Sequence, residues 1–141
     1  MIEDKIKDME NKLHDLSKSL EDYLEAIYLI SLDKNVVRVK SVVAKMDVKT
    51  ASVIGALKKL EAKGFIEHER YGYIELTKEG KLRASKIYEK HSKLLYFLNK
   101  ILGVREDIAE KDACNMEHYI SDDTFEKLIE FIELQKNITK P

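Results

Sequence analysis

The sequence predicts a mainly α-helical protein with one short β-hairpin near its middle. Three features of the 141 residues support this expectation. The only proline is Pro141, the last residue, so no proline ring interrupts a helix. All five glycines lie between Gly55 and Gly103, which places most turns in the central part of the chain. Apolar residues make up 44% of the chain, a content that supports a hydrophobic core.

The N-terminal part carries the pattern of four helices. Apolar residues recur at helical spacing over residues 2–16, 20–32 and 51–63, and the segment VKSVVAKM predicts a short helix over 39–46. Ser17 and Ser19 are candidate N-caps of the second helix. A turn is expected at residues 47–50, and Gly64 is expected to end the fourth helix. In that helix, the residues expected to face the core are Val53, Ala56, Leu57 and Leu60.

The pattern then changes to two short β-like runs. Residues 65–70 and 73–76 flank Gly72 and predict a hairpin. Thr77 is the candidate N-cap of a long helix over 78–101, which Gly103 ends, and further helices are expected at about 105–119 and 122–136. This order predicts a helical extension at 1–17, a winged helix-turn-helix domain at 18–80 and a helical domain at 81–141.

The helix at 51–63 has the features of a helix that reads DNA in the major groove. The residues at its start are small or polar, and in such a helix the first residues reach the base edges: they are Lys49, Thr50, Ala51 and Ser52. Basic residues that could contact phosphates are Lys40, Lys45, Lys58, Lys59 and Arg70. The hairpin tip, Arg70-Tyr71-Gly72, is the expected wing.

Charge is distributed unevenly along the chain. The net charge is −1 overall, which excludes a globally basic coat protein, but residues 35–90 hold thirteen Lys/Arg and seven Asp/Glu, a difference of +6. We therefore expect double-stranded operator DNA as a partner; a surface helix pair with solvated lysines is the alternative. Gly55, inside the helix, costs about 1 kcal/mol relative to alanine. Close approach to DNA or clearance from a neighbouring helix would account for it.

Six side chains have the donor types of a divalent metal site. Cys114, Glu117 and His118 lie at i, i+3 and i+4 in DACNMEHYIS, which places them on one face of a helix. Asp22 and Glu25 lie at i, i+3 on the first core helix, and His91 lies on the long helix. Thiolate, imidazole and carboxylate together bind borderline divalent cations. Alternatively, Cys114 is a small core residue, His91 a half-buried histidine, and the others are solvated.

Four motifs resemble the diphtheria-toxin-repressor/manganese-transport-regulator (DtxR/MntR) family of metal-activated bacterial and archaeal repressors. They are SLEDYLEAIY, DVKTASVIGALKKLEAKGF, ELTKEG and DACNMEHYIS, and the resemblance extends from about Ser19 to Leu134. It implies a homodimer built through the C-terminal helices and a divalent metal held between the first core helix and the C-terminal module. Ala51 and Gly55 stand where relatives often carry proline and glutamine, so a different base readout is expected.

The resemblance also assigns the ligands. Asp22 and Glu25 match the acidic pair of the manganese-type branch, Cys114 matches the cysteine of the iron-type branch, and His91, Glu117 and His118 match ligands of both. The mixed set implies Mn²⁺ or Fe²⁺, with Zn²⁺, Co²⁺ or Ni²⁺ as possible surrogates. At an additional iron-type site, Leu95 and Glu110 replace the Glu and His ligands, which makes that second site doubtful.

These features predict a metal-activated transcriptional repressor of iron or manganese homeostasis rather than an enzyme. A charged N-terminus, a single cysteine and the lack of a long apolar run predict a cytoplasmic protein with no membrane segment. A winged-helix regulator of an organic ligand, a structural zinc site and a hydrolase that uses Glu117 are the alternatives. Apolar residues of the C-terminal half predict a dimer face or an internal core: Leu94, Leu95, Phe97, Leu98, Ile101, Phe125, Leu128, Ile129 and Ile132.

Overall fold

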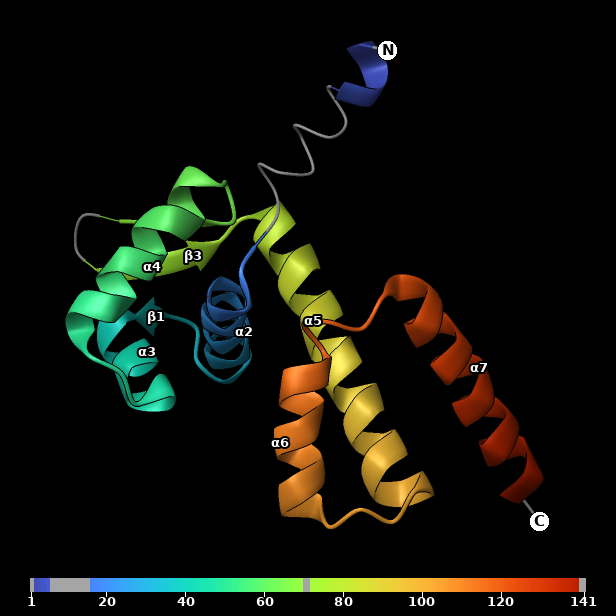
Figure 1. Ribbon diagram of the computed structural model, residues 1–141. Coiled ribbons are helices and arrows are strands. Elements are labelled where there is room, and N and C mark those ends of the chain that lie inside the picture. Colours follow the sequence, from blue (N-terminus) through green and yellow to red (C-terminus); the bar gives the residue numbers. More distant parts are fainter. Residues whose placement is uncertain (1, 6–15, 70–71, 140–141) are drawn as a thin grey trace. The chain divides into compact units, whose positions relative to one another are not determined.

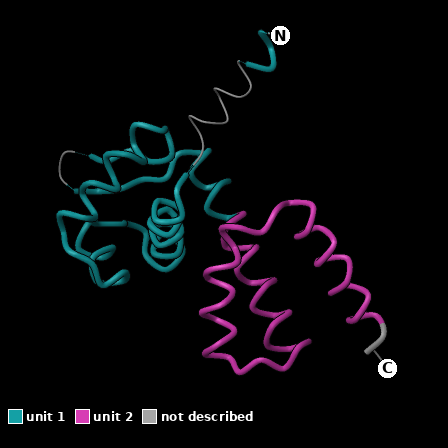
Figure 2. Tube along the Cα trace, in the orientation of Figure 1, with its two compact units in different colours: residues 1–85 teal, residues 86–141 magenta. Residues whose placement is uncertain are grey.

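The computed structural model describes residues 2–5, 16–69 and 72–139 and divides into two compact units, residues 1–85 and 86–141 (Figure 2). Residues 2–5 are helical. The rest of the predicted N-terminal helix up to residue 15, and the wing-tip candidates Arg70 and Tyr71, lie outside the described residues.

The described part of unit 1 holds the helical residues 2–5, the helices α2, α3 and α4, a small antiparallel sheet and the beginning of a long helix that continues into unit 2 (Figure 1). The helices are α2 (Lys18–Asp33), α3 (Val39–Met46) and α4 (Thr50–Ala62), and the strands are β1 (Val37–Arg38), β2 (Ile66–His68) and β3 (Tyr73–Leu76). The helices predicted at 20–32, 39–46 and 51–63 and the hairpin are confirmed, with bounds that differ by two residues or fewer at the helix ends. The strand β1 is an addition, because two residues are too few to show a period in the sequence. It pairs with β3, so the sheet order is β1-β3-β2.

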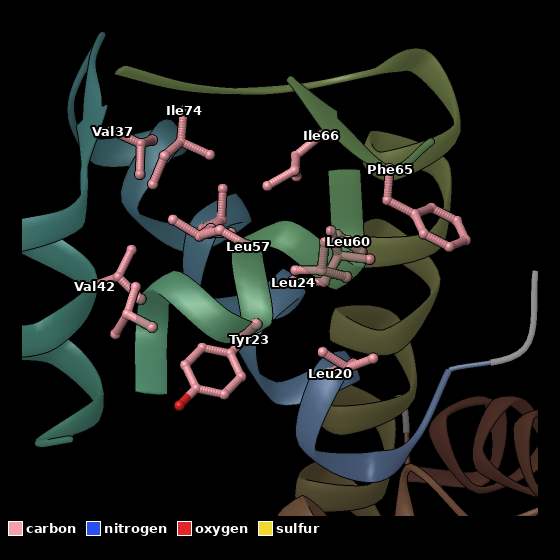
Figure 3. Close-up of a cluster of buried hydrophobic side chains, with 14 of the residues drawn as sticks. Leu20, Tyr23, Leu24, Val37, Val42, Leu57, Leu60, Phe65, Ile66 and Ile74 are labelled. Atoms are coloured by element: carbon pink, nitrogen blue, oxygen red, sulfur yellow. The ribbon is translucent and has the colours of Figure 1, made fainter. Parts of the chain in front are cut away.

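The core of unit 1 forms where α2, α3 and α4 meet the sheet (Figure 3). Leu24 and Ile27 of α2 and Val42 of α3 are fully buried there. All four residues of α4 that were expected to face inward are buried. Full burial of a leucine, isoleucine or valine side chain stabilises the fold by roughly 1.5–3 kcal/mol. This core therefore fixes the position of α4 within unit 1.

Capping bonds set where the helices of unit 1 begin and end. Ser17 Oγ accepts a hydrogen bond from the Leu20 amide at 3.2 Å, as predicted for the N-cap of α2. Asp47 follows α3 with a φ of 54°, and Gly64 follows α4 with a φ of 82°; both values lie in the left-handed region that ends a helix.

The segment ELTKEG joins the sheet to the next helix, α5 (Lys78–Tyr96). Thr77 Oγ1 accepts from the Gly80 amide at 3.1 Å and donates to the Gly64 carbonyl at 2.7 Å, so one hydroxyl caps α5 and anchors it to the end of α4. A Cβ atom on Gly80 would lie 2.0 Å from the Phe65 carbonyl oxygen. The close approach of two backbone segments therefore requires glycine at this position.

Unit 2 consists of the second half of α5, a π-helical turn η1 (Phe97–Ile101), α6 (Glu106–Met116) and α7 (Asp122–Thr139). The predicted long helix therefore finishes in π geometry, with the Leu102 amide bonded to the Phe97 carbonyl at 3.0 Å. Gly103, at a φ of 77°, and a bond from Asn99 Nδ2 to the Val104 carbonyl complete the turn into α6. Leu94 and Leu98 pack against Ala109 and Ala113 of α6. Among the described residues, no helix combines the length and apolar character that a membrane span requires.

Candidate metal centre and nucleic-acid interface

Helices α5 and α6 of unit 2 bring three of the predicted ligands together. His91 lies on α5, Cys114 lies on α6, and Glu117 is the residue that caps α6. One potential ligand atom from each lies within 4.8 Å of the other two. Cys114 is exposed, which rules out its alternative role as a small core residue. The sequence could pair Cys114 with Glu117 by helical spacing, but only the packing of α5 on α6 adds His91.

The two buried members of this cluster, His91 and Glu117, form a hydrogen-bonded pair. His91 Nδ1 lies 2.7 Å from Glu117 Oε2, and the two residues are only 8% and 3% exposed. A carboxylate in such a place is costly unless it is paired. The other oxygen, Glu117 Oε1, lies 3.2 Å from His118 Nε2, yet within the described part of the chain it makes no hydrogen bond.

This donor set fits a divalent cation. It combines a thiolate, an imidazole and a buried carboxylate whose Oε1 has unused acceptor capacity. Because a cation would satisfy that oxygen and offset the buried negative charge, the arrangement is better suited to metal binding than to packing alone.

The end of α6 differs from the prediction. The helix was expected to continue to about residue 119, but α6 ends at Met116, and the amides of Tyr119 and Ile120 both bond to the Met116 carbonyl. Glu117 keeps helical backbone angles, with a φ of −58° and a ψ of −28°. His118, in contrast, lies in the turn that follows, so the expectation that all three ligands share one helix is corrected for this residue.

A lysine on α5 holds this turn in place. Lys90 Nζ lies 3.1 Å from Asp122 Oδ1 and donates to the Ile120 carbonyl at 3.5 Å. Lys90 precedes His91, so the same stretch of α5 supplies one candidate ligand and fixes the turn that carries another.

Asp22 and Glu25 lie on α2 in unit 1. Both are half-buried and one helical turn apart, and Asp22 forms an ion pair with Lys18 at 3.6 Å. Leu24, between them in sequence, faces the core, so α2 fixes the position of the two carboxylates within unit 1. That they join the donors of unit 2 stays a prediction.

Glu110 makes a contact with His91 that was not predicted from the sequence. Its Oε1 atom lies 2.8 Å from His91 Nε2, so the imidazole is held between two carboxylates. The available signal was spacing: Glu110, Cys114 and Glu117 lie at i, i+4 and i+7, which places Glu110 one helical turn before the cysteine.

The predicted DNA contacts that the structure describes lie on α4 and at its N-cap, with Lys40 on α3. The described candidates are all exposed: Lys40, Lys49, Thr50, Ala51, Ser52, Gly55, Lys58 and Lys59. A Cβ atom on Gly55 would meet no atom within 4 Å among the described residues. Clearance from a neighbouring helix among the described residues therefore does not explain this glycine, and its close approach to DNA stays a prediction.

The sheet adds a basic residue that was not among the candidates. Arg38 of β1 stands opposite Tyr73 at the start of β3, its guanidinium lies 5.1 Å from the centre of the tyrosine ring, and it donates a hydrogen bond to the hydroxyl at 3.3 Å. Arg38 thereby extends the exposed basic surface from α4 to the strand next to the wing.

Two family models cover most of the chain. Residues 15–74 match the model of the iron-dependent repressor N-terminal DNA-binding domain, and residues 77–137 match that of the iron-dependent repressor metal-binding and dimerisation domain. The boundary between the models falls next to Thr77, the residue that caps α5.

Similar proteins come from an archaeon and a bacterium. An HTH-type transcriptional regulator of Methanocaldococcus jannaschii is 37% identical over 123 residues, which cover 86% of this chain and 98% of that protein. The HTH-type transcriptional regulator MntR of Shouchella clausii is 32% identical over 123 residues, 86% of this chain and 85% of its own length.

A solved structure of the manganese regulator SloR superposes with a TM-score of 0.72 at 32% identity and covers 81% of this chain. This chain spans about half the length of that structure, 53%. The similarity therefore concerns the part of SloR that corresponds to the two units described above.

Proposed function

The chain belongs to the iron-dependent repressor family, and we propose that it is a transcriptional repressor that binds operator DNA as a homodimer when Mn²⁺ or Fe²⁺ is bound. The observation that carries this proposal is the convergence of His91, Cys114 and Glu117 in a chain that also exposes a basic recognition helix. The names of two relatives, a regulator MntR and a manganese regulator, support a role in manganese or iron homeostasis. A regulator of this kind works in the cytoplasm, where the DNA is.

The proposed ligand set joins the two units. His91, Cys114, Glu117 and His118 supply the donors of unit 2, and Asp22 and Glu25 add two carboxylates from α2. The thiolate favours Fe²⁺ or Zn²⁺, whereas the carboxylates favour Mn²⁺. The choice between Mn²⁺ and Fe²⁺ therefore depends on how many of the acids bind.

In this proposal, metal binding is coupled to DNA binding by electrostatic interactions among the ligands. A bound divalent cation supplies two positive charges among these donors. Without that charge, a ligand set that gathers Asp22, Glu25, Glu117 and the Cys114 thiolate is disfavoured by repulsion among its negative groups. Because α2 packs directly on α3 and α4 in the core of unit 1, its position sets that of the recognition helix. Metal can raise the population of the DNA-competent state only if it binds that state more tightly than the other states.

The DNA contacts divide into two kinds. Lys49, Thr50, Ala51 and Ser52 reach base edges from the start of α4, while Lys40, Lys58 and Lys59 contact phosphates, with Arg70 and Tyr71 at the wing. A homodimer presents two such helices, so the operator is expected to contain two half-sites about one helical turn apart.

Apolar residues on α7 support the homodimer. Several of the apolar residues predicted for the dimer face are used within the chain, since Leu94, Leu98, Phe125 and Ile132 are buried. Phe131 and Leu134, three residues apart on α7, are 43% and 60% exposed, which leaves an apolar strip for a second copy.

The test uses the full chain after treatment with a chelator. Operator fragments are selected from random DNA with Mn²⁺ present, and affinity is then measured by fluorescence anisotropy with no metal, with Mn²⁺ and, without oxygen, with Fe²⁺. We expect metal to tighten binding at least tenfold. The double variant Glu117→Ala/His118→Ala loses this response, and Glu130→Ala, an exposed acid of α7, keeps it. Equal DNA affinity with and without metal would refute the proposal. Calorimetry that shows no tight metal uptake would favour a regulator of an organic ligand instead.

A further inference from the structure

We propose that Glu110 is a positioning residue of the metal centre, whose carboxylate orients the imidazole of His91 so that Nδ1 faces the donor cluster. This inference rests on the proposed function and deepens it. Its basis is the 2.8 Å contact between Glu110 Oε1 and His91 Nε2, on the opposite side of the ring from the 2.7 Å contact between Nδ1 and Glu117 Oε2.

The contact of Glu110 with Nε2 determines which nitrogen of the His91 imidazole carries the proton. A neutral imidazole carries a proton on one nitrogen and a lone pair on the other. A carboxylate that accepts the Nε2–H therefore leaves the Nδ1 lone pair for a bound cation, which would take the place of the proton that Nδ1 shares with Glu117 Oε2 in their 2.7 Å contact. A carboxylate in this position also holds the ring plane and raises the basicity of the ligand nitrogen. Removing such a partner typically weakens metal binding by about 10–100-fold.

Exposure and position separate the roles of the two glutamates. The Glu110 side chain is 53% exposed and therefore in contact with water, whereas the Glu117 side chain is fully buried. Among the described residues, Glu110 belongs to none of the groups of three donor atoms that lie within 4.8 Å of one another, whereas Glu117 does. Glu110 thus acts on the metal centre through His91 and not as a ligand.

Spacing along α6 makes the arrangement specific. Glu110 precedes Cys114 by four residues and Glu117 by seven, so these three side chains follow one another on the side of α6 that faces His91. Lys90 fixes the turn that follows α6, as described above. A side chain at position 110 that is too short to reach the ring would leave Nε2 to water, and the ring would lose its fixed tautomer.

Calorimetric titration with Zn²⁺ tests this role in the full chain. We compare the unmodified protein with Glu110→Ala, Glu110→Gln and the matched control Glu106→Gln, which removes an exposed charge one turn earlier on α6. We expect Glu110→Ala to weaken Zn²⁺ binding by about 10–100-fold with no change in the number of ions per chain. Glu110→Gln recovers part of the affinity because its amide oxygen still accepts the Nε2–H. Glu106→Gln changes the affinity less than about threefold.

A second measurement determines the tautomer of the His91 imidazole. In protein with ¹⁵N-labelled histidine and bound Zn²⁺, long-range ¹H–¹⁵N correlations identify which nitrogen of His91 is protonated. We expect the proton on Nε2 in the unmodified protein and a mixture of tautomers, or an altered Nε2 resonance, in Glu110→Ala. If Glu110 had only a structural role, Glu110→Ala would leave the tautomer of His91 unchanged, and Glu110→Gln would not recover Zn²⁺ affinity.

Four results would overturn the inference. The first is equal Zn²⁺ affinity in Glu110→Ala and the unmodified protein, which refutes the role of Glu110 and leaves the proposed function standing. The second is the loss of one ion per chain in Glu110→Ala, which would make Glu110 a ligand. The third is a proton on Nδ1 of His91 in the Zn²⁺-bound protein. Absence of Zn²⁺ uptake by the unmodified protein would refute the inference together with the proposed metal centre.

Discussion

Replacing Gly80 with alanine should destabilise unit 1 through a single clash. The new Cβ atom would lie 2.0 Å from the Phe65 carbonyl oxygen and 3.2 Å from Leu76 Cδ2. Contacts of this kind are essentially never shorter than 3.0 Å, so two backbone segments must separate by about 1.0 Å. That carbonyl also accepts the Thr77 amide at 3.0 Å, and the displacement strains this bond.

The expected magnitude follows from these contacts. Overpacking of this size typically costs about 1–3 kcal/mol, and weakening the hydrogen bond to Phe65 adds up to about 1.5 kcal/mol. Alanine in a helix regains at most about 1 kcal/mol relative to glycine. The net loss in the free energy of unfolding is therefore about 2 kcal/mol, which corresponds to a fall in Tm on the order of 10 °C.

Thermal unfolding followed by circular dichroism measures this effect. Gly55→Ala is the matched control, because the same substitution in α4 meets no atom within 4 Å among the described residues. The control should raise the free energy of unfolding by up to about 1 kcal/mol. A Gly80→Ala variant that melts at or above the temperature of the unmodified protein would show that the close approach of α5 to Phe65 is not a constraint on the fold.

Two further substitutions test the proposed DNA and dimer surfaces. Gly55→Ala should weaken binding to a selected operator on the order of tenfold, about 1.4 kcal/mol, because a methyl group would project from the exposed side of α4. Fluorescence anisotropy with Mn²⁺ present measures this affinity. Unchanged affinity would argue against close approach of Gly55 to DNA. Leu134→Glu should convert the homodimer into a 16.4 kDa monomer in light scattering coupled to size exclusion, because it places a charge in the exposed apolar strip of α7. A mass that stays at twice this value would place the dimer face elsewhere.

Much of the local structure could be predicted from neighbouring residues. Ser17 and Thr77 cap α2 and α5 as expected, because an N-cap side chain bonds to an amide only two or three residues away. Gly64 ends α4 by its left-handed backbone. In contrast, the two-residue strand β1 forms only because it pairs with β3. The π-helical turn at 97–101 depends on the turn after it, in which the Val104 amide bonds back to the Leu98 carbonyl.

The sequence by itself determined which donor types are present and which of them are neighbours on one helix, because the rise and twist of an α-helix bring residues three and four apart onto one face. That was sufficient to select Cys114 and Glu117. The contact of His91 with both Glu110 and Glu117 joins residues 19 and 26 positions apart. Only the tertiary structure decided it, because the meeting of α5 with α6 depends on the geometry of the turn between them and on the packing of Leu94 and Leu98 against Ala109 and Ala113.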